Sequence, residues 1–88
     1  MSNFIITAKH DMFLSPGKEI KKGDSFDVFV SKPFVNKATL FNSPEVRSSV
    51  IRQLSNKDID LVACRKEYFL NNGHFQVEER KNVLANNY

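Results

Sequence analysis

The alternation of apolar and polar residues is clearest over residues 25–30, Ser-Phe-Asp-Val-Phe-Val. A period of two predicts a strand with Phe26, Val28 and Val30 on a core and Ser25, Asp27 and Phe29 facing water. Pro33 ends this strand, because proline cannot donate to a sheet ladder. Residues 4–8, Phe-Ile-Ile-Thr-Ala, are rich in β-branched side chains and predict an earlier strand.

The spacing of apolar residues becomes helical after residue 43, where Val46, Val50, Ile51 and Leu54 form one stripe. Ser43 is suited to cap the first turn, and Pro44 has the φ angle of a first helical residue. Asn56 tolerates the left-handed conformation that ends many helices. The pattern predicts one amphipathic helix at about residues 44–55.

Two further β segments are predicted after the helix. Ile59, Leu61 and Ala63 alternate with Asp58, Asp60 and Val62, which predicts a strand at residues 59–63. Asn72-Gly73 is a preferred pair for a two-residue type I′ turn, and it predicts a C-terminal β-hairpin at about residues 66–79. The register centred on this turn puts Phe69 on the outer, polar face of the hairpin.

These elements predict an α+β fold: a small, mainly antiparallel sheet or partly open β-barrel with one helix and a C-terminal hairpin. One domain is expected over residues 1–80, because 88 residues are too few for two cores. Residues 81–88 show little periodicity and are predicted to form a flexible C-terminal tail.

The composition indicates the class of protein and its expected location. The content of hydrophobic residues (41%) and charged residues (26%) is that of a folded globular protein. A single cysteine and a first segment without a signal sequence favour an intracellular, cytoplasmic location, and the absence of a long apolar run argues against a membrane. Frequent Asn and Lys are typical of AT-rich genomes, including many phages, so a virion location is an alternative.

The residue types needed for catalysis or metal binding are sparse. One cysteine and two histidines are too few for a structural zinc site, and the three glycines are isolated turn formers rather than a phosphate loop. Cys64 lies among apolar neighbours and is interpreted as a buried structural thiol. The sequence therefore predicts a protein without enzymatic activity and without a cofactor.

Two aromatic side chains are predicted to face water, Phe29 on the strand at 25–30 and Phe69 on the hairpin. Aromatic residues concentrate in the cores of protein interfaces, and a domain of this size buries only about 60% of its unfolded surface. We therefore expect a non-catalytic protein-interaction or assembly module that binds another protein or a copy of itself. A phage or mobile-element accessory protein, such as a virion or capsid-associated component, fits this expectation.

A small nucleic-acid-binding protein is the alternative, supported by a net charge of +3. Its contacts would be Lys18, Lys21, Lys22, Arg47 and Arg52. Arg47 and Arg52 are five residues apart, about 140° around a helix axis, so they do not form one stripe. This geometry makes the protein-interaction module the first expectation.

Overall fold

The computed structural model describes residues 2–80, so the predicted tail at 81–88 lies outside the described residues. Along the chain the elements are β1 (Ser2–Ala8), β2 (Met12–Ser15), β3 (Lys18–Ile20), β4 (Ser25–Val30), α1 (Pro44–Ser55), the short 3-10 helix η1 (Glu67–Phe69) and β5 (Phe75–Arg80). The predicted α+β class is confirmed. The strands form two small antiparallel sheets, and those of residues 2–80 do not close into a barrel.

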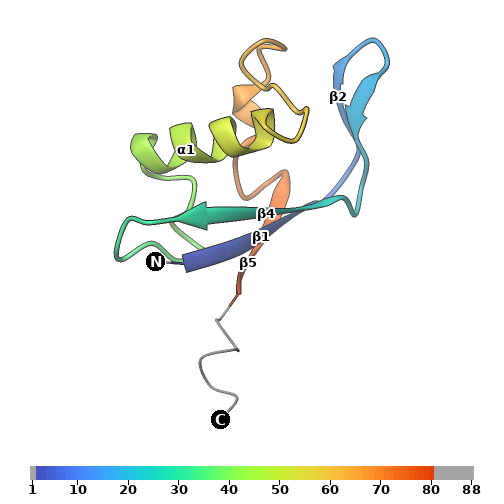
Figure 1. Cartoon of the computed structure of the whole chain (residues 1–88). Helices are drawn as coiled ribbons and strands as arrows, with labels where there is room; N and C mark the ends of the chain where they lie inside the picture. Colours follow the sequence, from blue (N-terminus) through green and yellow to red (C-terminus); the bar gives the residue numbers. More distant parts are fainter. Residues whose placement is uncertain (1, 81–88) are drawn as a thin grey trace.

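The larger sheet has the order β4-β1-β5, with β1 paired antiparallel to both neighbours (Figure 1). Ile6 lies opposite Phe26 on β4 and opposite Val77 on β5. Phe4, Ile6 and Ala8 are buried because they share the face that α1 covers, whereas Asn3 on the other face is exposed. The strands predicted at 4–8 and 25–30 are confirmed.

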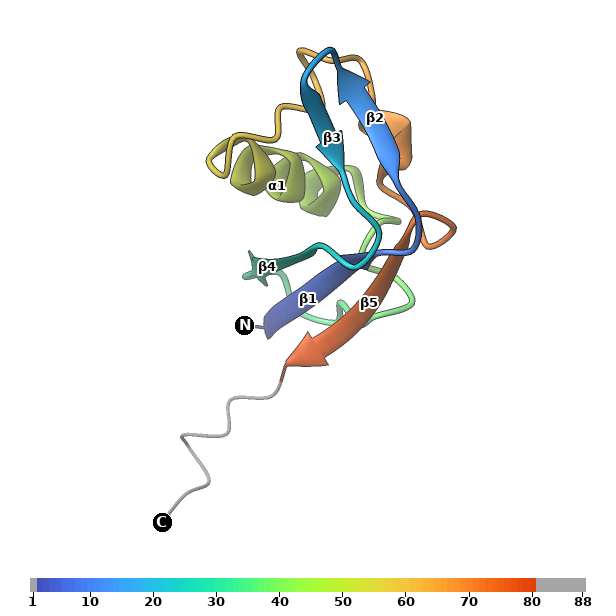
Figure 2. The ribbon, with the colours of Figure 1, turned by 90° about the vertical axis from the view of Figure 1, so that its right-hand side faces the viewer.

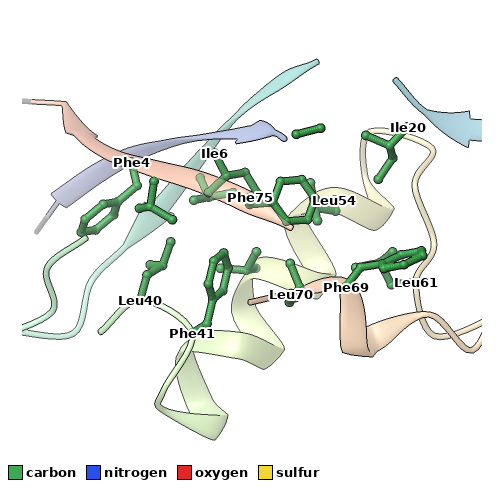
Figure 3. Packing of buried hydrophobic residues seen from close by; sticks show 14 of the residues in the cluster. Phe4, Ile6, Ile20, Leu40, Phe41, Leu54, Leu61, Phe69, Leu70 and Phe75 are labelled. Atoms are coloured by element: carbon green, nitrogen blue, oxygen red, sulfur yellow. The ribbon is translucent and has the colours of Figure 1, made fainter. Parts of the chain in front are cut away.

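Helix α1 packs over the inner face of this sheet. The predicted bounds of 44–55 are confirmed, and the stripe buries Val46, Val50 and Leu54. Figure 3 shows Leu54 beside Phe75, with Leu40 of the loop before α1 below Phe4 and Phe41 below Ile6 and Phe75. The ring centroids of Phe41 and Phe75 are 6.4 Å apart. The sheet, the helix and this loop thus share one apolar core.

The β2–β3 hairpin extends away from the larger sheet (Figure 2). Its turn follows Ser15 and uses Gly17 at a φ of 80°, which only glycine adopts without strain. Met12, Leu14 and Ile20 are buried on its inner face, and Ile20 lies near Leu61 and Phe69 in Figure 3. The hairpin therefore closes the core at this end.

The predicted hairpin at 66–79 is wrong. Its second strand exists as β5, but β5 pairs with β1, and residues 67–69 form η1. A type I′ turn needs positive φ at both central residues, and the residues of the Asn72-Gly73 pair do not adopt it. Instead Asn71 Oδ1 accepts the N–H groups of Gly73 (2.7 Å) and His74 (3.1 Å), and this side-chain turn redirects the chain into β5.

Three smaller predictions also fail. Residues 59–63 form turns rather than a strand; Asp60 Oδ1 accepts the N–H of Ala63, and Leu61 is buried from within a turn. Ser43 makes no side-chain cap, and its hydroxyl oxygen accepts a hydrogen bond from Lys32 Nζ at 3.3 Å instead. Asn56 keeps right-handed geometry, and the left-handed residue after α1 is Asp58 (φ 68°).

Candidate protein-interaction surface

Phe29 occupies the edge strand β4, and the predicted outward orientation of its side chain is confirmed. Its neighbours Val28 and Val30 are buried, whereas 45% of the Phe29 surface is exposed beside Asn3 of β1. The outer backbone edge of Phe29 is held by α1. Its N–H donates to Gln53 Oε1 (2.8 Å), and Gln53 Nε2 donates to its carbonyl oxygen (2.8 Å).

Phe34 is a second exposed aromatic, which the sequence analysis did not single out. Its side chain is 99% exposed in the loop that follows β4, and its backbone has a φ of 64°. Positive φ is a genuine outlier for a bulky residue. In the sequence, Phe34 follows Pro33 in a segment without periodicity. The pattern therefore assigns its ring to no core position.

A groove lies between the end of β4 and α1. Figure 1 shows β4 ending below α1, where the loop that leads to the helix begins. The groove has a volume of about 230 Å³ and is lined by Val30, Ser31 and Lys32 from the β4 side and by Glu45, Val46, Ser49 and Arg52 from α1. The helix residues recur at steps of one, three and three, so they share one face of α1. We call Phe29, Phe34 and this groove the β4-end surface. It wraps around the edge strand, because the Phe29 ring lies on the sheet face opposite α1 and the groove lies on the α1 side.

The charged residues of the groove are only loosely paired. Lys32 Nζ lies 3.6 Å from Glu45 Oε2, and both side chains are largely exposed. Arg52 is exposed and makes no side-chain hydrogen bond or salt bridge to any residue from 2 to 80. The groove therefore presents two cationic side chains and one carboxylate above the buried Val30 and Val46.

The predicted orientation of Phe69 is wrong. Only 9% of its surface is exposed, because η1 turns the ring inward where a strand would have turned it outward. Its ring centroid lies 4.8 Å from that of Tyr68 and 5.1 Å from that of His74. Tyr68, 57% exposed, takes the outward position instead, so Phe69 offers almost no surface to a partner.

The five basic residues of the nucleic-acid alternative are not brought together. Lys18 lies 3.0 Å from Asp58, and the hydrogen bond and negative charge of Glu19 raise the pKa of Lys21. Lys22 is exposed beyond β3. The Arg47 guanidinium is part-buried and donates to the carbonyl oxygens of Leu70 and Glu67, so it ties α1 to η1. Arg52 alone lines the groove.

His10 and His74 lie side by side, although they are 64 positions apart in the chain. No local sequence signal connects the two residues. His10 Nε2 lies 2.8 Å from His74 Nδ1, and His10 Nδ1 lies 3.0 Å from the Asp11 carbonyl oxygen. Since a carbonyl only accepts, a neutral His10 would carry its proton on Nδ1 and accept at Nε2 from His74 Nδ1–H, whereas a charged His10 would donate from Nε2 to His74 Nδ1. Burial, and then the charge of His10, lower the pKa of His74.

Among residues 2–80, His, Cys, Asp and Glu side chains form no group of three or more suited to a metal ion. No helix in this part of the chain is long and apolar enough to cross a bilayer. Comparisons of the chain with protein families, with curated proteins and with solved structures gave no match. Function is therefore inferred from geometry and charge alone.

Proposed function

We propose that this protein is a non-catalytic protein-interaction module whose contact surface is the β4-end surface. The observation that carries the proposal is Phe34, which is 99% exposed on a left-handed backbone. Such a backbone costs on the order of 1–3 kcal/mol, and strain of this kind clusters at ligand clamps and switch regions. An aromatic ring held outward at that cost is suited to insert into a partner.

Phe29 supports the same assignment from the adjacent strand. Gln53 fixes the outer backbone groups of Phe29, so the ring is presented from a rigid edge that a further strand cannot extend at this residue. Side-chain contacts are therefore the mode of recognition that we propose here. The partner is another protein or a second copy of the chain. The Asn and Lys content supports a phage or mobile-element accessory protein, acting in the cytoplasm or in a virion.

The test is quantitative affinity capture from an extract of the encoding organism or its host, with sedimentation velocity for self-association. We expect the wild-type protein to retain a partner or to self-associate, and the double variant Phe29→Ser/Phe34→Ser to lose that binding. Phe13→Ser is the matched control, because Phe13 is also exposed but lies on β2. Undiminished binding by the folded double variant would overturn the proposal.

Nucleic-acid binding is the less favoured proposal. A phosphate backbone is bound by cations that follow one track, and affinity grows with the number of phosphates neutralised. Here Lys18 and Lys21 are paired with carboxylates and Arg47 is engaged in the fold. The fluorescence anisotropy of a labelled single-stranded oligonucleotide measures such binding. We expect no salt-sensitive binding at low ionic strength.

A further inference from the structure

The groove of the β4-end surface carries a surplus of positive charge. Lys32 and Arg52 face one carboxylate, Glu45, whose separation of 3.6 Å from Lys32 is longer than a close charge-assisted hydrogen bond. Exposed pairs contribute little free energy, and this one is longer than those of Lys18 and Lys21. Lys32 also donates to Ser43 Oγ at 3.3 Å, and its remaining protons can bind a second carboxylate. Arg52 has no anionic partner among residues 2–80.

Hydroxyl groups add uncharged donors to the same groove. Ser49 Oγ accepts a hydrogen bond from Gln53 Nε2 at 3.1 Å, which leaves the hydroxyl proton of Ser49 available to donate. Ser31 lines the opposite wall. Two cations and two hydroxyls over an apolar floor form a donor set suited to an anion, and the planar guanidinium of Arg52 matches a carboxylate in particular.

The size of the groove limits the occupant. Its volume of about 230 Å³ is below the roughly 300–1,000 Å³ of sites for drug-sized ligands, and it suits one side chain. Glu45 in the lining disfavours a continuous run of phosphates, whereas a single carboxylate can contact Arg52 beside Ser49. Phe34 stands two residues beyond Lys32, so an apolar contact is available next to the charged one.

We infer that the groove seats an aspartate or glutamate side chain of a protein partner, while an apolar residue next to it in the partner packs on Phe34. This inference rests on the proposed function and adds the chemistry of the partner: an acidic side chain beside an apolar one. Arg52 binds the carboxylate, Ser49 donates a hydrogen bond to it, and Lys32 on the facing wall adds positive charge.

The test is a titration of the ¹⁵N-labelled protein, followed by its amide spectrum at low salt, with two dipeptides. N-acetyl-Asp-Phe-amide and N-acetyl-Asn-Phe-amide differ only in the charged group. We expect the Asp dipeptide to shift the amides of residues 30–32 and 45–52 and to bind about fivefold more tightly than the Asn dipeptide, the scale of one exposed ion pair. Arg52→Gln should remove that difference, and Lys22→Gln, a matched exposed cation on another element, should preserve it.

Each other outcome overturns the inference in a distinguishable way. Equal affinities for the two dipeptides, or no shifts with either, would exclude a carboxylate site, while the capture experiment with Phe29→Ser/Phe34→Ser still decides the proposed function. If (dT)₈ shifts the same amides at lower concentration than the Asp dipeptide and Arg52→Gln abolishes that shift, the groove binds nucleic-acid phosphate instead.

Discussion

At the scale of single residues, Gln53 fixes the position of the β4 edge. Its amide group bonds to both the N–H and the carbonyl of Phe29, as the backbone of a neighbouring strand would. Nothing in the stripe of apolar residues predicts this role, because Gln53 lies outside the stripe and its partner is 24 positions away in the chain. The helix could be predicted from sequence, but this contact could not.

Replacing Gln53 by Ala should therefore destabilise the fold. The two hydrogen bonds to Phe29 and the one to Ser49 are lost. The freed backbone groups of Phe29 turn to water, so we expect a decrease of about 1 kcal/mol in the free energy of unfolding. Urea denaturation measures this change. Gln76→Ala is the control, because Gln76 lies exposed on β5 and bonds only to the side chain of Glu78. Equal stability of the two variants would contradict the role of Gln53.

Phe34→Gly should raise stability while removing the proposed contact. Left-handed geometry costs about 1–2 kcal/mol for a residue with a Cβ atom, and the extra freedom of glycine in the unfolded chain offsets roughly 0.5–1 kcal/mol of the relief. The ring makes almost no contact with the fold, so we expect a net gain of about 0.5–1 kcal/mol in urea denaturation. Lys37→Gly, in the same loop at ordinary φ, should lower stability. A destabilised Phe34→Gly would show that the ring supports the fold.

The His10–His74 pair predicts a pH dependence of stability. Since folding lowers the pKa of His74, the unfolded chain binds more protons just below the ordinary value of 6.5, and stability falls as pH drops through that range. We expect the urea midpoint of the wild-type protein to decrease from pH 7.5 to pH 5.5 by more than that of His74→Gln. The carboxylates contribute equally to the decrease in both proteins, so the difference between the two decreases reports on His74. Parallel decreases in both proteins would contradict the prediction.

At the scale of elements, the sequence predicted those whose signals are local. β4 and α1 have clear periods of two and of about 3.6 residues, and both were found at the expected residues. The hairpin failed because Phe75 and Val77 fit two partners equally well by pattern. Pairing with Ala8 and Ile6 of β1 places them in the core, and this long-range choice is not encoded in a neighbouring turn.

Asn71 forms the turn that allows β5 to pair with β1. Its side chain accepts two backbone N–H groups and donates to the carbonyl of Tyr68, which shapes the turn between η1 and β5. Asn71→Ala should lower the free energy of unfolding by about 1 kcal/mol in urea denaturation. Asn72→Ala is the matched control, since Asn72 makes one long side-chain bond of 3.4 Å, to Lys37. An equal loss in both variants would contradict the assignment of the turn to Asn71.

At the scale of the whole molecule, most chemical features are spread over separate places. Phe13 lies on β2, Tyr68 on η1, and the histidine pair joins the segment after β1 to the turn before β5. In contrast, Phe29, Phe34 and the groove all belong to β4, the loop that follows it and the part of α1 that faces β4. Sequence analysis found Phe29 and Arg52 but not their relation to Phe34, Lys32 and Gln53. That relation depends on how α1 folds back over β4, which no short motif specifies.

The dissociation constant of the retained partner, or of the self-associated form, decides whether the β4-end surface is the contact surface, and sedimentation or calorimetry measures it. Interface anchors of this type contribute about 2 kcal/mol or more, so Phe29→Ser/Phe34→Ser should weaken binding at least about 30-fold. Phe13→Ser should bind within about twofold of the wild-type protein. If the folded double variant binds as tightly as Phe13→Ser, the β4-end surface is not the contact surface.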